Sequence, residues 1–233
     1  MAARLRLALI LALLTLAAAL RPGAIVAAGP SVTDEGVTNH FPDGIEFRVS
    51  ASADRPIEKV SLRYTILPDG TTARAVPDFE PGARVSTSLT LAGGEADVYL
   101  PPGTRIRYHW EVEDADGNTA STPEDTVVYE DVRFDWKSVE ANGIVLHYYS
   151  GSDEDAQAMR GVAQDAIAQA SDLLNAKVEF PVNVRIYNSV DDMRSALQRR
   201  SESYESQIIT AGVRVSSDTV LVLGNVSFST LRH

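Results

Sequence analysis

The chain has 233 residues, 32 acidic and 21 basic side chains, no cysteine and a formal net charge of −11. An apolar content of 44% is ordinary for a folded protein of one or two domains, and the lack of cysteine excludes disulfides, thiolate metal sites and cysteine nucleophiles. The negative charge argues against nucleic acid as a partner, because binding to phosphates requires a basic surface.

Residues 1–28 have the features of a secretory signal peptide. Arg4 and Arg6 precede a nearly continuous apolar run, 7–20, and small residues follow it. A basic start, an apolar run of about 7–15 residues and a small-residue exit are typical of such a signal, so we expect cleavage after Ala28. The alternative is an uncleaved anchor, although the run is shorter than the roughly 20 residues that span a bilayer comfortably.

The mature chain is therefore expected to be exported, either to the extracellular space or to the cell envelope. The membrane would be a partner only through the N-terminal signal or through a C-terminal anchor beyond the given sequence. Residues 1–28 hold three arginines and no acid, so the remainder carries 18 basic and 32 acidic groups, a net charge of −14.

Residues 29–43 are expected to be a lead-in, and residues 44–130 are predicted to form an antiparallel β-sandwich of the immunoglobulin-like or fibronectin-like type. Apolar and polar residues alternate here, which is typical of strands that bury one face. Turn sequences such as Pro68-Asp69-Gly70 separate the strands. The alternating apolar residues are Ile45, Phe47, Val49, Val60, Leu62, Tyr64 and Ile66, and further strands are predicted at 85–91, 105–112 and 127–129.

One loop of the predicted sandwich admits two interpretations. Asp114, Asp116 and Asn118 place oxygens at alternate positions, as in a calcium loop. The stretch lacks the distant bidentate glutamate of such loops, and Asp116-Gly117 is a strong hairpin signal, so a turn is favoured. Trp110, just before it, is expected in the core rather than as a platform for a ligand.

Residues 131–136 are predicted to be a linker, and residues 137–233 an incomplete α/β (α+β) domain. Apolar residues at steps of three and four from Ala156 to Leu174 predict an amphipathic helix. Ser152 and the three acids after it form a favourable helix start, an interpretation preferred over a metal cluster. The other predicted elements are strands at 144–149 and 182–186, a helix from Ser189 through Leu197, and a hairpin of 208–215 and 219–223.

A last helix is predicted to begin at Thr230, and the sequence stops at His233 within its first turn. A single helical turn is not stable, because nucleation costs more than one hydrogen bond returns. The preceding strands also need a covering layer. We therefore expect this chain to be the front portion of a longer protein.

The sequence resembles the exported bacterial peptidase-MA-like proteins, which belong to the gluzincin group of zinc metallopeptidases. The residues that carry the resemblance are 110–118 (WEVEDADGN), 129–136 (YEDVRFDW) and 230–233 (TLRH). The resemblance covers nearly all of the mature chain. It implies an immunoglobulin-like domain followed by a peptidase domain, in which a helix and strands lead to an antiparallel edge strand and then to a helix with His-Glu-x-x-His.

The resemblance places His233 at the first histidine of that motif, as a zinc ligand. In such a motif two histidines bind one zinc, and the glutamate between them is the general base on zinc-bound water. That base would lie just beyond His233, so no catalytic residue is expected within the chain. Zinc is implied for the full-length parent, whereas this chain alone is predicted to hold none tightly and to be inactive. His40, His109 and His147 are expected to be structural.

The resemblance also assigns substrate binding to Gly212, Val213, Arg214 and Val215, on an edge strand that would pair with an extended peptide or protein substrate. An ordinary sheet strand is the alternative. The leading hypothesis is an exported zinc-dependent metallopeptidase. The rival is a non-catalytic exported binding or adhesion protein that recognises a surface or protein partner through its sandwich, and the fold alone does not choose between them.

Overall fold

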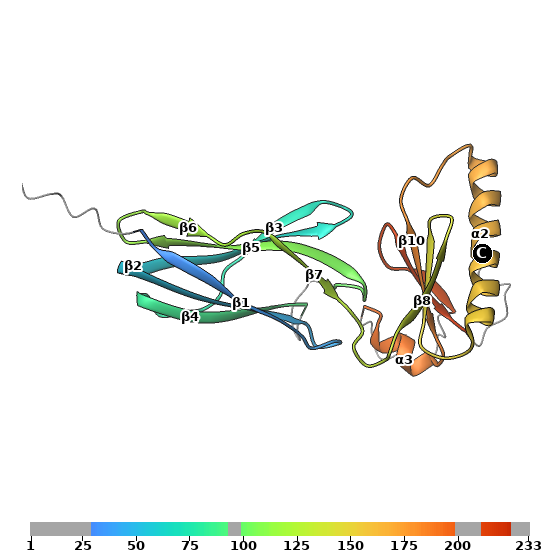
Figure 1. Ribbon diagram of the computed structural model, residues 1–233, viewed down its shortest axis with the longest axis horizontal. Helices are drawn as coiled ribbons and strands as arrows, with labels where there is room; N and C mark the ends of the chain where they lie inside the picture. The colour runs from blue at the N-terminus through green and yellow to red at the C-terminus, as the bar shows by residue number, and fades with distance from the viewer. Residues whose placement is uncertain (1–28, 93–98, 199–210, 225–233) are drawn as a thin grey trace, which may run out of the picture.

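The computed structural model describes residues 29–92, 99–198 and 211–224. Their secondary structure is mostly β and is arranged in two units (Figure 1). Strands β1 to β7 form the first unit, and strands β8 to β12 form a five-stranded sheet that helix α2 covers on one face. The predicted signal peptide, residues 1–28, and the predicted zinc ligand, His233, lie outside the described residues.

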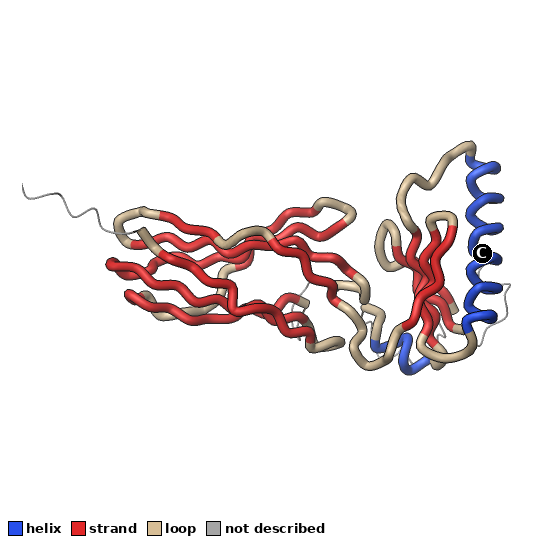
Figure 2. The backbone as a smooth tube through the Cα atoms, viewed as in Figure 1, coloured by secondary structure: helices blue, strands red, loops and turns tan. Residues whose placement is uncertain are grey.

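The first unit is built around one long strand, β2 (Ile45–Leu67), whose two halves pair with different neighbours. The first half lies between β1 and β4, and the second half lies between β3 and β5 (Figure 2). The other strands are β1 (Ser31–Asn39), β3 (Thr71–Ala75), β4 (Gly82–Leu91), β5 (Thr104–Asp114), β6 (Thr119–Ser121) and β7 (Asp125–Tyr129).

The register of β2 shifts between Ser52 and Ile57, where the strand changes from one set of partners to the other. Pro56 lies in this segment, and a proline suits such a break because it has no N–H to donate. The two halves share one core, since the rings of Phe47 on β2 and Tyr108 on β5 lie 4.8 Å apart. One strand thus ties both layers of the sandwich together.

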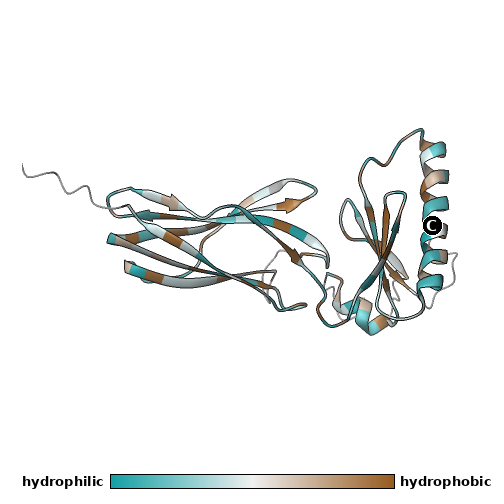
Figure 3. Ribbon diagram, viewed as in Figure 1, coloured by the Kyte–Doolittle hydropathy of each residue, from teal (hydrophilic) through white to brown (hydrophobic). Residues whose placement is uncertain are grey.

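The predicted alternation is confirmed for β5 and for the first half of β2, and Figure 3 shows it along the strands, whereas in the second half of β2 Ser61 is buried as well as Val60 and Leu62. Phe47 and Trp110 are fully buried, the latter in the core as expected. The lead-in expected at 29–43 is wrong, because residues 31–39 form β1, which pairs antiparallel with β2. The sequence does not predict this strand, because only two of its side chains, Val32 and Val37, are apolar and pack against the core.

The loop that resembled a calcium site is a hairpin turn between β5 and β6. The carboxylate of Asp114 accepts the backbone N–H groups of Asp116 and Asn118 at 3.0 and 2.9 Å. It also accepts the side-chain amide of Asn118, which is the main reason that the pKa of Asp114 lies below its usual range. Gly117 has a φ of +81°, a conformation that favours glycine. The turn interpretation is confirmed.

The second unit is a mixed sheet in the order β11-β12-β10-β9-β8. The three central strands run parallel, and each edge strand runs antiparallel to its neighbour. Apolar side chains of the central strands contact α2 on one face of the sheet. The strands are β8 (Lys137–Ala141), β9 (Ile144–Tyr148), β10 (Val182–Tyr187), β11 (Gly212–Arg214) and β12 (Thr219–Leu223).

Helix α2 (Asp153–Leu174) begins at Ser152, whose hydroxyl accepts the N–H of Asp155 at 3.1 Å. The helix start predicted at Ser152 and the three acids after it is thus confirmed. The apolar stripe packs on the sheet only in part, because Leu173 and Leu174 are 86% and 72% exposed. A helix of this length spans about 33 Å, whereas a five- or six-residue strand spans about 20 Å, so the helix extends past the sheet. Within the described residues, no helix is long and apolar enough to cross a membrane.

The predicted linker is an ordered joint centred on the buried side chain of Asp131, which is 0% exposed. Its carboxylate accepts Nε and Nη2 of Arg133 at 2.8 and 2.6 Å and the hydroxyl of Tyr187 on β10 at 2.9 Å. Its backbone oxygen accepts the indole N–H of Trp136 at 2.8 Å. One residue therefore connects the end of the sandwich with the second sheet.

A second contact runs from Arg185 on β10 to Glu130, the residue before Asp131. Both terminal nitrogens of Arg185 bind the Glu130 carboxylate, and its guanidinium lies 5.3 Å from the ring of Trp136. The side chain also crosses Gly103, where a Cβ would lie 2.5 Å from Nη2. The apolar cluster of the sandwich continues through this joint to Leu221 on β12. The two units therefore share one core.

We predict that Asp131→Ala lowers the free energy of unfolding by about 2 kcal/mol, because it leaves the buried hydroxyl of Tyr187 without its acceptor and removes the ion pair with Arg133. Urea unfolding followed by circular dichroism measures the change. Asp135→Ala is the control, since Asp135 is an exposed carboxylate on the same segment. Equal stability of the two variants would show that the joint contributes nothing.

Candidate functional site

The predicted substrate-binding segment forms the edge strand β11 together with the residue after it. β11 pairs antiparallel with β12, and within the described residues its other side pairs with no strand. The hairpin predicted with 219–223 is thus confirmed for residues 212–223, whereas residues 208–210 lie outside the described residues. The edge position that β-augmentation requires is present here.

The hydrogen bonds of β11 indicate which backbone groups face the free edge. The oxygen of Ala211 accepts the N–H of Leu223 at 2.8 Å, and the N–H of Val215 donates to Thr219 at 3.0 Å. In an antiparallel pair these bonds recur at every second residue. The N–H and C=O groups of Gly212 and Arg214 therefore point away from β12. The resemblance assigns substrate binding to all four residues, whereas the strand pairing leaves the backbone groups of only Gly212 and Arg214 at the free edge.

Side chains of the segment divide in the same alternating way. Val213 and Val215 are partly buried and pack against the shared core. Gly212 and Arg214 are exposed. The valines thus hold the strand on the sheet, and Gly212 and Arg214, which alternate with them, stay exposed.

The far end of β12 is held tightly against β10. The N–H of Gly224 donates to the oxygen of Tyr187 at 2.7 Å. A Cβ on Gly224 would lie 2.6 Å from Cγ2 of Ile186, so only glycine fits this approach. The end of β12 is therefore fixed against β10.

The described residues contain no group of three histidine, aspartate or glutamate side chains that would hold a metal ion. His40 lies within 3.7 Å of Glu46 on the sandwich, and His109 lies 3.4 Å from Glu111 on the outer face of β5. Each of these histidines thus has a carboxylate beside it on the sandwich. A zinc site at His233 lies outside the described residues and stays a prediction.

His147 on β9 lies in the second sheet, on the face opposite α2. Its Nε2 lies 3.2 Å from Oδ1 of Asn183 on β10. Burial, and then the nearby charge of Arg185, lower the pKa of His147 below its usual range. The imidazole is therefore held in its neutral form, which suits a structural role.

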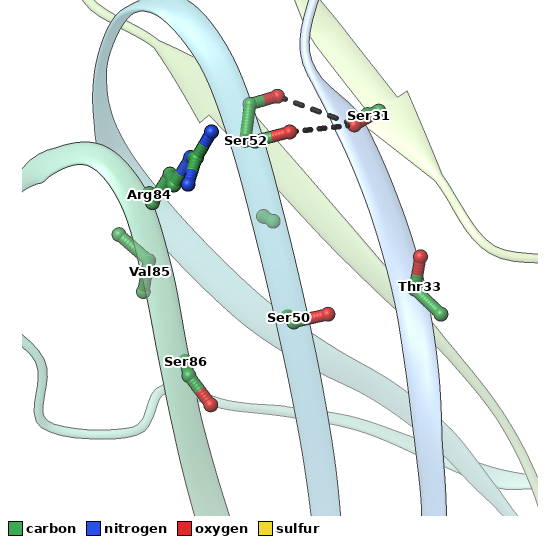
Figure 4. Close-up of a pocket in the computed structure, with 8 residues that line it drawn as sticks. Ser31, Thr33, Ser50, Ser52, Arg84, Val85 and Ser86 are labelled. Atoms are coloured by element: carbon green, nitrogen blue, oxygen red, sulfur yellow. Dashed lines mark hydrogen bonds between the residues drawn. The ribbon is translucent and has the colours of Figure 1, made fainter.

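The sandwich carries a shallow, open depression of about 450 Å³ over strands β1, β2 and β4, shown in Figure 4. The hydroxyls of Ser31 and Ser52 lie 3.0 Å apart, and Ser50 donates to Glu35. Its polar lining residues are Ser31, Thr33, Ser50, Ser52, Arg84 and Ser86. Ser31 and Ser52 satisfy each other and none of these residues is buried, so the depression does not select a ligand by itself.

No protein-family model and no curated protein matches the sequence. Among solved structures, the crystal structure of a Br derivative of BhCBM56, a carbohydrate-binding module, is similar over 43% of this chain and 99% of its own. The identity is 12% and the TM-score is 0.27. A likeness this weak carries no argument about fold or function.

We predict that His147 makes stability depend on pH. Its pKa is lowered in the folded state, so the unfolded state takes up a proton first as the pH falls through about 6.5. The free energy of unfolding should therefore decrease between pH 7.5 and 5.5, and His147→Asn should reduce that decrease. Urea unfolding of both proteins across this range tests it, and identical pH profiles would contradict it.

Proposed function

We propose that this chain belongs to an exported zinc-dependent peptidase and carries the strand that binds the substrate backbone. The observation on which the proposal rests is the edge strand β11, which runs antiparallel to β12 and exposes backbone groups of Gly212 and Arg214. The resemblance to peptidase-MA-like proteins supplies the catalytic part of the proposal, since it expects such an edge strand just before the zinc-binding helix.

The proposal gives each part of the chain a distinct task. β11 binds an extended peptide through the N–H and C=O of Gly212 and Arg214, in the manner of an added strand. His233 is one zinc ligand, and the remaining ligands and the general base come from residues after it. Bound zinc would polarise the scissile carbonyl and lower the pKa of its water. The exported location rests on residues 1–28.

Production of the chain together with the residues that follow His233 in its natural reading frame tests the proposal. We expect about one zinc per molecule, held by three protein ligands, and hydrolysis of an unfolded protein such as casein. His233→Ala should reduce bound zinc and hydrolysis roughly 100-fold or more, because it removes a direct ligand. Metal analysis and a peptide-release assay measure the two quantities.

His40→Ala serves as the matched control, since His40 is an exposed histidine on the sandwich, beside Glu46. It should leave zinc content and hydrolysis unchanged. Equal zinc in the His233→Ala protein would contradict the assignment of this ligand. A protein with neither zinc nor hydrolysis would overturn the peptidase proposal and favour the non-catalytic binding protein.

A second prediction tests the backbone role of Arg214. In the same extended protein, Arg214→Pro removes the N–H at the free edge while β11 keeps its bonds to β12, because proline is tolerated at such positions. We expect KM for an extended peptide to rise roughly fivefold, the effect of one lost hydrogen bond, with kcat nearly unchanged. Arg214→Ala keeps the N–H and should leave KM near that of the natural protein. Equal effects of the two variants would assign the role to the side chain instead.

A further inference from the structure

The outer face of the second sandwich layer concentrates positive charge in a chain that is otherwise acidic. Along β5 the residues at alternate positions point away from the core, because Ile106, Tyr108 and Trp110 between them are buried. Four arginines gather on this surface, which we call the arginine face: Arg63 on β2, Arg74 on β3, and Arg105 and Arg107 on β5.

Strand pairing brings these side chains close together. Arg74 lies directly opposite Arg63, and Arg63 lies opposite His109. Neighbouring strands are about 4.8 Å apart, and alternate residues along one strand are about 6.8 Å apart. Arg74 on β3 and the two arginines of β5, Arg105 and Arg107, therefore lie on either side of β2, and one linear molecule that crosses these strands can contact all three.

Three carboxylates lie on the same surface and leave it positive, since one of them, Glu113, is paired with Lys59 at 2.7 Å. Glu111 accepts Nε of Arg63 at 2.7 Å, which holds the pKa of this carboxyl below its usual range. Glu124 is 61% exposed and lies 4.0 Å from Arg107. Within the described residues, Arg74 and Arg105 make no ion pair or side-chain hydrogen bond. Two of the four arginines are thus unpaired, in a chain whose net charge after residue 28 is −14.

Arg74 gains no stabilising partner from the residue opposite it, because Arg63 carries the same charge and is itself paired with Glu111. Like charges directly opposite each other on neighbouring strands destabilise the pair. A role in stability therefore does not explain Arg74, whereas an anionic partner does, because it would neutralise both groups when bound.

We propose that the arginine face binds a linear polysaccharide that carries carboxylate groups. The planar fork of arginine matches a carboxylate in bidentate geometry. The hydroxyls of Thr65 on β2 and Thr126 on β7 lie beside Arg107 in the pairing and suit sugar hydroxyls. This site is distinct from β11, and it does not depend on peptidase activity.

A folded protein partner fits this surface less well. Protein interfaces have an apolar centre in which aromatic or aliphatic anchors are buried. The apolar side chains at this face are few and lie at its margin: Val128 and Leu67 are opposite Arg105, and Val76 follows the end of β3. A long, hydrated and charged chain needs no such centre, because it binds through repeated polar contacts.

The test measures binding of a fluorescently labelled oligogalacturonate to the full chain by anisotropy. We expect binding that weakens as salt is raised, because the contacts are exposed ion pairs. The double variant Arg74→Thr/Arg105→Thr should weaken binding roughly tenfold, since two surface ion pairs are lost. Arg84→Thr is the matched control, an unpaired and exposed arginine on β4, and should leave affinity unchanged.

Two ligand controls separate the possible partners. The methyl ester of the same oligogalacturonate keeps the sugar chain but loses the charge, and it should not bind. Poly-L-glutamate at equal carboxylate concentration should compete weakly, and equal or stronger binding would reassign the face to acidic proteins. No binding of the oligogalacturonate, or equal binding by the double variant, would overturn the proposal.

The stability of the single variant Arg74→Thr distinguishes a binding role from a structural one. Removal of one of two opposed charges should raise the midpoint of urea unfolding while affinity falls. A lower midpoint together with lower affinity would indicate that Arg74 supports the sheet, and would contradict the proposed role.

Discussion

The buried carboxylate of Asp131 is the constraint on which the arrangement of the chain depends. A charged group that is fully buried must be paired and hydrogen-bonded, and Arg133 and Tyr187 supply those bonds. Arg133 belongs to the joint itself, and Tyr187 belongs to strand β10. The carboxylate therefore receives all of these bonds only when β10 lies against the joint, which holds the second sheet beside the end of the sandwich. Residues 131–136, which the sequence predicts to be a linker, therefore hold the two units together through these contacts.

The neighbouring contact of Arg185 extends this constraint to the second sheet. Arg185 and Tyr187 alternate with Val184 and Ile186 on β10, so this strand presents polar groups to the joint and apolar groups to α2. β10 therefore holds the sandwich on one face and the helix on the other. β12 pairs with β10, and β11 pairs with β12. The edge strand proposed to receive a peptide is consequently only two strands away from the joint.

The sequence predicts those parts of the fold that depend on local pattern. Alternation in β2 and β5, the cap at Ser152 and the turn at Asp114 follow from neighbours within a few residues. Strand β1 was missed because its burial comes from pairing with β2 rather than from its own apolar residues. The joint was missed because the partners of Asp131 include a residue 56 positions away. The edge position of β11 was expected from resemblance, whereas the roles of single residues within it required the register of the strand pair.

The length of β11 constrains how a partner strand would bind. Natural sheets protect their edges with short strands, bulges or charged residues. β1 has a bulge between Asp34 and Gly36, and β8 begins with Lys137. β11 is protected by its length of three residues, which leaves backbone groups of only two residues at the edge. So few hydrogen bonds, each worth about 1 kcal/mol, hold a peptide only briefly. Pairing at this edge therefore suits a ligand that is aligned and then released, and any tight affinity has to come from contacts elsewhere.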